Sequence, residues 1–364
     1  MYKITDRYLY KELLFPFLTA NTALVIIGIV DVVFSLIDYL INRGVGIFVV
    51  IKLLAYKIPA ILVLFMPIAT LFAVMIVIIR MIKDDELIVF WTSGISYDRI
   101  LVPIIIFALF VTGFALYLEE TLVPWTNYRS NTLVQRVVLK KTIPFIEENV
   151  FFKDSDNRYF YIKQINKRQS SMEGIMMYEL GNNFPQVVVA DKAEWNGNFW
   201  SLYKGHIHRY GDTGFFEYEA AFDKLKLRVD YDLDSSYQKV KNTKEMSSKE
   251  IGKRIKITEK AGLDSKKLRV EYYMKFAMPF SNFVFAVIGI VLIFLLVRSP
   301  KDVFGVVLSI LLSLLSIGFF IFLMAFFRAL SIGGAITPFI GAWAPNFIYI
   351  TLSSYAWAWY RFRY

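Results

Sequence analysis

Ionisable side chains interrupt long apolar runs at a few places, and these are the first candidates for chemistry. Asp31 and Asp38 are seven residues apart, so on a helix they share one face. Glu271 and Lys275 are four apart with the acid first, which favours a local ion pair on the helix surface. Charges are costly in an apolar environment, so such residues mark functional candidates by default. Two carboxylates on one face would suit a proton-coupled carrier, whose activity would depend on a pH gradient.

His206 and His208 alternate along a predicted strand and therefore share a face, as two ligands of a metal would. No third ligand is near them in the sequence, so we interpret them as polar positions on one side of a strand. The chain has no Cys, no phosphate-binding G-x-x-x-x-G-K-[ST] loop, no H-E-x-x-H and no G-x-S-x-G. We therefore predict a protein that is not an enzyme and has no cofactor.

The stretch KDDELIVFWTSGIS, Lys83–Ser96, combines three acids with four large apolar side chains between two apolar runs. Acids favour the start of a short helix, and Gly94 can supply the left-handed residue that ends it. A helix lying in the lipid interface usually carries Lys and Arg on its polar face, so it explains the acids poorly. A docking helix explains both features, because apolar residues fill a partner's pocket while acids meet its basic rim. The candidate docking residues are Asp84, Asp85, Glu86, Leu87, Phe90 and Trp91.

The elements that must position these residues follow from composition. The chain has 364 residues, 56% of them hydrophobic and 17% aromatic, gathered into blocks. A bilayer core of about 30 Å needs roughly 20 apolar residues per helix. Six blocks satisfy this: Phe15–Ile41, Ile58–Ile82, Ile100–Leu118, Phe276–Val297, Val303–Phe327 and Ile336–Tyr360. No small-residue cleavage site follows the first block, which we interpret as an uncleaved span.

The fold prediction is an α-helical membrane protein with six transmembrane helices and an inserted extracytoplasmic all-β domain, jelly-roll-like in architecture. Residues 1–118 would hold the first three spans, with the short helix near 83–95, and residues 119–246 the β domain. Residues 247–267 would form a connector helix and 268–364 the last three spans. The polar segment between the third and fourth spans is large enough to fold as a domain.

Lys and Arg in the short loops predict the orientation. If the N-terminus is cytoplasmic, the inside segments carry Lys3, Arg7, Lys11, Arg80, Lys83, Arg99, Arg298, Lys301, Arg361 and Arg363. The outside loops then carry Arg43, Lys52, Lys57 and Arg328. This excess predicts that both termini are cytoplasmic. The formal charge of +10 is largely explained by these flanking residues, and no basic and aromatic interleaving indicates nucleic acid as a partner.

From Val150 to Leu233 the apolar pattern has period two, with turn signals such as Asn196-Gly197-Asn198 between runs. Short strands at this spacing favour an antiparallel sandwich or jelly roll. Further on, Ser247 and Glu250 have the spacing of a capping box, and Gly262 is placed to end the helix that follows.

In the order and spacing of its segments, the chain resembles the LptF/LptG family over essentially its full length. The segments that carry the resemblance are DRYLYKELLFPF, KIPAILVLFMPIATLFAVMIVI, DDELIVFWTSGIS, GIMMYEL, VVVADKAEW, MSSKEIGKRIKITEKAGLDSKKLRVEYYMKFAMPF and GAWAPNFIYI. Members are paired membrane subunits of the ABC machine that extracts lipopolysaccharide from the inner membrane.

The resemblance implies that Lys83–Ser96 holds the coupling helix on a cytoplasmic ATPase, with Asp85, Glu86 and Leu87 at its core positions. It implies that the outside domain is a jelly roll that continues a groove for acyl chains. ATP-driven closure of the ATPase would collapse the cavity between two membrane subunits, lined by spans one and five, and expel the lipid. Some members carry basic residues near the outer end of the first span. Here Arg43, Lys275 and Arg328 are the candidates for lipid contact.

The implied partners are a cytoplasmic ABC ATPase dimer, a second membrane subunit of the same family in a heterodimer, periplasmic jelly-roll bridge proteins, and lipopolysaccharide or a similar glycolipid. The implied location is the inner membrane, with the β domain in the periplasm. Two alternatives stay open. One is the permease subunit of another lipid or lipoprotein ABC exporter, whose outside domain would usually be mixed α/β. The other is a membrane-anchored extracytoplasmic binding or sensor protein without an ATPase, which leaves Lys83–Ser96 unexplained.

Overall fold

A computed structural model describes most of the chain, which forms two compact units. The helical unit comprises Met1–Asn131 with Lys241–Tyr364, and the sheet unit, inserted into it, comprises Thr132–Val240. The described residues are 2–41, 46–94, 96–138, 151–153, 158–166, 171–179, 186–195, 199–210, 216–228, 241–260, 264–297 and 299–363.

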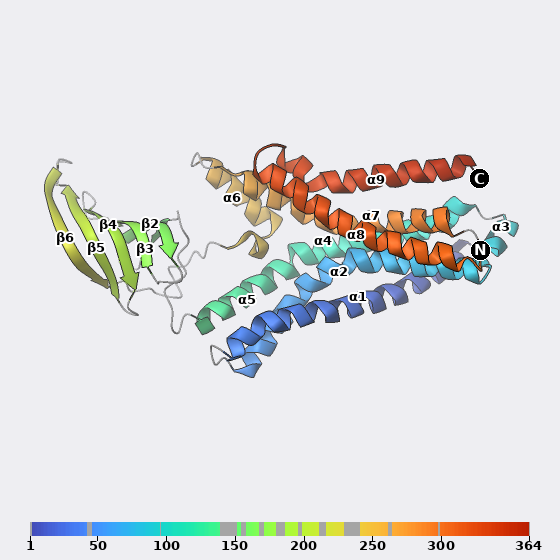
Figure 1. The fold of residues 1–364 in the computed structure, drawn as a ribbon, viewed down its shortest axis with the longest axis horizontal. Coiled ribbons are helices and arrows are strands. Elements are labelled where there is room, and N and C mark those ends of the chain that lie inside the picture. Colours follow the sequence, from blue (N-terminus) through green and yellow to red (C-terminus); the bar gives the residue numbers. More distant parts are fainter. Residues whose placement is uncertain are drawn as a thin grey trace. The chain divides into compact units, whose positions relative to one another are not determined.

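Long helices build the helical unit (Figure 1). They are α1 (Tyr2–Ile41), α2 (Ile47–Lys83), α4 (Tyr97–Glu120), α5 (Leu122–Val138), α7 (Lys266–Leu296), α8 (Val303–Ile332) and α9 (Pro338–Arg363). Helix α5 belongs to this unit only up to Asn131. The boundary predicted at residue 119 lies inside α4, and only Thr121 separates α4 from α5.

Five helical segments in the described part of the chain are long and apolar enough to cross a membrane. They are Asp6–Leu36, Ile47–Lys83, Arg99–Val134, Lys266–Leu296 and Val303–Ile332. The predicted sixth block forms α9, a helix of 26 residues with Pro345 inside it, and its sequence is richer in Tyr and Trp than the other spans. The sixth span therefore stays a prediction.

Helix α7 lies at the core of the helical unit, where it packs against α2, α4, α8 and α9. It is apolar on most sides from Val284 to Phe294, which is typical of a helix surrounded by other helices. Gly289 allows α2 to come close, because a Cβ at this position would lie 3.1 Å from Leu71 Cδ1.

Polar side chains in this core find partners on neighbouring helices. Asn346 of α9 donates to the Ala277 carbonyl at 2.9 Å, and Tyr349 of α9 donates to the Ser316 carbonyl of α8 at 2.7 Å. Asn346 and Tyr349 are buried, and a buried polar group costs free energy unless it is hydrogen-bonded. These bonds therefore anchor α9 to α7 and α8.

The chain ends and the shortest helix, α3 (Glu86–Thr92), lie at one end of the helical unit, and α6 (Ser248–Lys260) lies at the other (Figure 1). Helices α1 and α2 have similar lengths and form a hairpin, so the end of α2 returns to the end of the unit where the chain began. Helix α3 follows directly after α2 and therefore lies at that end.

The sheet unit contains one antiparallel sheet whose strands follow chain order, each paired with the next (Figure 1). The strands are β1 (Phe151–Lys153), β2 (Arg158–Asn166), β3 (Ser171–Glu179), β4 (Gln186–Trp195), β5 (Phe199–Tyr210) and β6 (Phe216–Arg228). The predicted antiparallel strands are confirmed. A jelly roll needs two facing sheets, and the described strands form a single meander, so that part of the assignment stays a prediction. The turn signals Asn196–Asn198 lie outside the described residues.

The alternating pattern places apolar residues on one face of this sheet. Phe160 of β2 lies opposite Met177 of β3, which lies opposite Val188 of β4. All three are almost fully buried, as is Trp200 of β5, whose ring centroid lies 5.9 Å from that of Phe160. With no Cys in the chain, this apolar row is the stabilising core of the unit.

The connector between the sheet and α7 begins with a short turn of helix, η1 (Thr243–Glu245), followed by α6. The predicted capping box is present: the Ser247 amide donates to Glu250 Oε2 at 2.8 Å, and the Glu250 amide donates to Ser247 Oγ at 3.3 Å. Gly262 lies outside the described residues.

The capping box predicts how the stability of α6 changes at low pH. Burial acts to raise the pKa of Glu250, but hydrogen bonds from Lys241 and Ser247 outweigh it and hold the pKa below its usual value. The carboxylate thus stabilises α6 above about pH 4.3, its unfolded pKa, and the contribution is lost as pH falls through the lower, folded pKa. Glu250→Gln keeps the hydrogen bond to the Ser247 amide but removes the charge.

We expect the variant to speed hydrogen exchange at the first amides of α6 at pH 6 by about twofold, since the side chain is 39% exposed and solvent screens the ion pair. The difference from the wild type should vanish near pH 3. An equal difference at both pH values would contradict a role for the carboxylate charge.

Candidate functional site

Helix α3 joins α2 to α4 through two backbone positions with unusual conformations. Asp85, which precedes the helix, has φ of 57°, and Gly94, which follows it, has φ of 78°. Aspartate is among the few residues that tolerate this left-handed region. The left-handed end predicted at Gly94 is confirmed. The acids are placed differently from the prediction, since Asp84 terminates α2 and only Glu86 lies in the first turn of α3.

The inner side of α3 is fixed to the helical unit. Leu87 is 4% exposed within the main apolar core, and Phe90 packs against the same core. Tyr8 of α1 donates to both oxygens of Glu86, at 2.8 and 3.0 Å. An apolar contact and a hydrogen bond to a charged group therefore tie α3 to the start of α1.

Arg80, in the last turn of α2, extends this network. Its Nη2 donates to the Tyr8 hydroxyl at 2.6 Å, and its guanidinium pairs with Glu12 of α1. Weaker ion pairs reach Asp84 at 3.8 Å and Glu86 at 4.0 Å. We call Tyr8, Glu12, Arg80 and Glu86 the α3 anchor, because together they join α1, α2 and α3.

The first turns of α1 also hold the start of α4. Arg99 Nη2 donates to Asp6 Oδ2 at 2.7 Å. Since Asp6, Tyr8 and Glu12 all belong to α1, this one segment contacts the helices on both sides of α3.

The outer side of α3 is exposed. Ile88, Val89 and Trp91 are 48%, 60% and 37% exposed, and the side chain of Asp84 is 57% exposed. Asp85 is also exposed. Beside α3 lies a shallow hollow of about 340 Å³ lined by Tyr8, Asp84, Glu86, Val89 and Phe90. The arrangement can offer apolar side chains and negative charge to a partner.

The six residues predicted for docking therefore have different surroundings. Leu87, Phe90 and Glu86 contact other helices of the helical unit, whereas Asp84, Asp85 and Trp91 are exposed. Sequence reasoning missed Tyr8 and Glu12, which are far from α3 along the chain. Arg80 could have been found, because it lies four residues before Asp84 on the same helix.

Two of the three basic candidates for lipid contact lie on α7 and α8. Arg43 lies outside the described residues. Lys275 of α7 is 6% exposed, and its ammonium contacts the side-chain and backbone oxygens of Glu119, both at 3.3 Å. Arg328 of α8 pairs with Glu271 of α7.

These pairs correct the predicted ion pair between Glu271 and Lys275, which the structure does not form. Each residue instead pairs across to another helix, because an interhelical partner also satisfies groups that would otherwise be buried alone. Asp31 of α1 is exposed, and the side chain of Asp38 lies outside the described part of the chain.

His206 and His208 of β5 stack with ring centroids 6.2 Å apart, and His206 Nδ1 lies 3.0 Å from Glu219 Oε1 of β6. Within the described residues, no group of three or more His, Cys, Asp or Glu side chains is arranged to hold a metal. The stacking of the two rings confirms that both histidines lie on one face of β5.

Comparison with known proteins shows the family to which the chain belongs. Residues 7–361 match the family model for the lipopolysaccharide export system permease LptF/LptG. The chain is also 24% identical over 283 residues to an uncharacterized protein of Rickettsia prowazekii (strain Madrid E), which covers 76% of this chain and 78% of that protein. The match and the long apolar helices together make this a multi-pass membrane protein, and the chain belongs to the LptF/LptG family of lipopolysaccharide export permeases.

Proposed function

We propose that the chain is one membrane subunit of an ATP-driven exporter that extracts lipopolysaccharide from the inner membrane and passes it to a periplasmic β-jelly-roll bridge. Family membership supports the substrate and the class of machine. The observation that carries the mechanism is helix α3, which is fixed on its inner side and exposed on its outer side.

The outer side of α3 would dock on one subunit of a cytoplasmic ABC ATPase dimer. Ile88, Val89 and Trp91 would fill an apolar pocket, and Asp84 and Asp85 would face basic residues at its rim. The inner side would transmit motion, because Leu87 and Glu86 connect α3 to α1 and α2. The chain itself would perform no bond chemistry.

The proposed orientation places α3 and both chain ends in the cytoplasm. Supporting it, these parts lie at the same end of the helical unit (Figure 1), and the short loops at that end hold most of the Lys and Arg. The sheet unit would then lie in the periplasm. This topology requires α9 to be a sixth span, so that the C-terminus returns to the cytoplasm.

A second membrane subunit of the same family would complete the cavity for lipid, in a heterodimer. The outward faces of α1 and α8 support this, since these are the two least buried of the five spans. Both expose rows of large apolar side chains, such as Phe15 and Phe34 on α1 and Leu315 and Phe322 on α8. Those faces would meet the partner subunit and acyl chains.

Among the basic candidates for lipid phosphate, Arg328 is favoured over Lys275 in the described part of the chain. The side chain of Arg328 is 42% exposed beside Glu271, whereas Lys275 is enclosed with Glu119. Arg43 stays a candidate from its position near the outer end of the first span.

The test is co-purification of the detergent-solubilised chain with the cytoplasmic ATPase of its host. We expect Trp91→Ala to lower the retained ATPase about tenfold, because removing one aromatic anchor from an interface typically costs 1–2 kcal/mol or more. Phe362→Ala is the matched control: Phe362 is 93% exposed on α9, near the chain end at the same end of the helical unit. If both variants retain the ATPase like the wild type, docking through α3 is wrong.

A further inference from the structure

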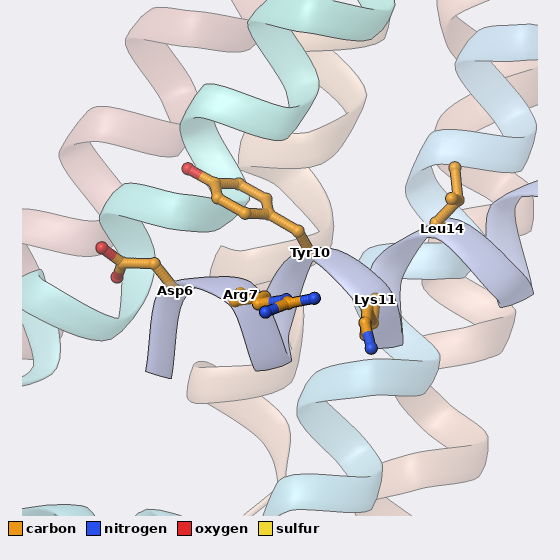
Figure 2. A pocket seen from close by; sticks show the side chains of 5 residues that line it. All are labelled: Asp6, Arg7, Tyr10, Lys11 and Leu14. Carbon is orange, nitrogen blue, oxygen red and sulfur yellow. The ribbon is translucent and has the colours of Figure 1, made fainter. Parts of the chain in front are cut away.

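A second hollow, of about 350 Å³, lies along the first turns of α1 and is lined by Asp6, Arg7, Tyr10, Lys11 and Leu14. Figure 2 shows all five side chains projecting from this one helix, with Arg7 and Lys11 adjacent to each other. This hollow lies on a different side of α1 from Tyr8 and Glu12, which join α1 to α2 and α3. The α3 anchor therefore leaves this surface free.

Two cations, Arg7 and Lys11, line this hollow, whose surface is otherwise mostly apolar. Arg7 and Lys11 are exposed, and within the described residues neither forms an ion pair. They are four residues apart, so their side chains lie on neighbouring turns of one face. Asp6 does not neutralise them, because its carboxylate is bound to Arg99 of α4. Two cations one turn apart can hold one anion between them.

The surface next to these cations is apolar. Leu14, Phe15 and Leu18 of α1 are 48%, 73% and 52% exposed. They begin the exposed apolar surface of the span that runs from Asp6 to Leu36. The hollow thus lies where a headgroup region would meet the acyl region, with Tyr10 between the two, as is common for aromatic side chains at an interface.

We propose that this hollow binds the headgroup of an anionic membrane phospholipid, with the phosphate between Arg7 and Lys11 and an acyl chain along Leu14 and Leu18. A soluble phosphate compound would use the cations but gain nothing from the exposed apolar row. Lys and Arg that only set the orientation of a span can lie anywhere near its cytoplasmic end. The proposed binding site instead needs both Arg7 and Lys11 at their positions beside this hollow.

The experiment measures phosphatidylglycerol bound to the purified chain by native mass spectrometry, with phosphatidylcholine of the same chain length as the neutral lipid. Each juxtamembrane cation contributes enough to change affinity for an anionic surface about fivefold. We therefore expect Arg7→Gln and Lys11→Gln each to weaken binding about fivefold, and the double variant on the order of 25-fold. The single variants keep one cation each, which protects insertion and folding.

The matched control is Lys83→Gln with Lys301→Gln, which removes the same charge from exposed positions at the same end of the helical unit. The proposal predicts less than a twofold change for this control. An equal loss in the two double variants would mean diffuse membrane electrostatics only. Equal binding of phosphatidylcholine, or displacement of the lipid by millimolar glycerol phosphate, would also overturn a phospholipid site.

Discussion

Glu119→Gln is expected to lower the free energy of unfolding of the helical unit by about 3–5 kcal/mol, because it leaves the ammonium of Lys275 buried without its counter-charge. Lys275 is 6% exposed and pairs with Glu119 at 3.3 Å, where water is poorly placed to replace the carboxylate. The measurement is unfolding of the detergent-solubilised protein in increasing denaturant, followed by circular dichroism.

Two further variants make this result specific. Glu119→Gln with Lys275→Met removes both charges and should recover most of the lost stability, since an apolar replacement of a buried ion pair is often neutral or stabilising. Glu271→Gln is the matched control: it also leaves a cation unpaired, but Arg328 is 42% exposed, so the loss should be about 1 kcal/mol or less. A similar loss for Glu119→Gln and Glu271→Gln would show that burial of Lys275 is not decisive.

Tyr8→Phe is expected to detach α3 from α1 while leaving its outer side intact. The substitution removes the hydroxyl that donates to Glu86 and accepts from Arg80, and hydrogen bonds to charged groups contribute about 1.5–3 kcal/mol. On the proposed function, the ATPase still docks and hydrolyses ATP, but lipid released per ATP falls about 30-fold. That factor corresponds to about 2 kcal/mol of lost anchoring.

The measurement pairs two readouts on the assembled exporter in proteoliposomes, ATP hydrolysis and lipopolysaccharide release. Tyr355→Phe is the matched control, because Tyr355 is 74% exposed on α9 and is not part of the α3 anchor. Loss of both activities together would indicate a folding defect rather than uncoupling. Full release per ATP in Tyr8→Phe would show that α3 moves α1 by another route.

Features set by neighbouring residues could be predicted from the sequence. The Ser247 and Glu250 capping box, the left-handed Gly94 and the antiparallel strands each depend on residues a few positions apart. Their physics is local, since a side chain reaches only the next turn of a helix or the facing position in a hairpin.

The α3 anchor and the buried ion pair depend on contacts between distant segments. Tyr8 and Glu86 are 78 positions apart, and Glu119 and Lys275 are 156 apart. Spacing alone favoured the wrong partner for Lys275, because Glu271 is four residues away and yet pairs with Arg328. The same limit applies to the acidic cluster: the sequence predicted a docking surface but could not show that Glu86 and Leu87 contact the helical unit instead.

The separation of Glu119 from Lys275 also has a consequence for biosynthesis. A ribosome adds roughly 5–20 residues per second, so Lys275, 156 positions later, is made about 8–30 s after Glu119. On the proposed topology, the third span is complete during that interval, the inserted sheet unit is being made and exported, and α7 does not yet exist. The carboxylate of Glu119 must therefore stay hydrated at the membrane surface, protonated, or covered by the insertion machinery until α7 arrives. The sequence separation therefore predicts that the helical unit assembles in two stages, and that this ion pair forms only in the second.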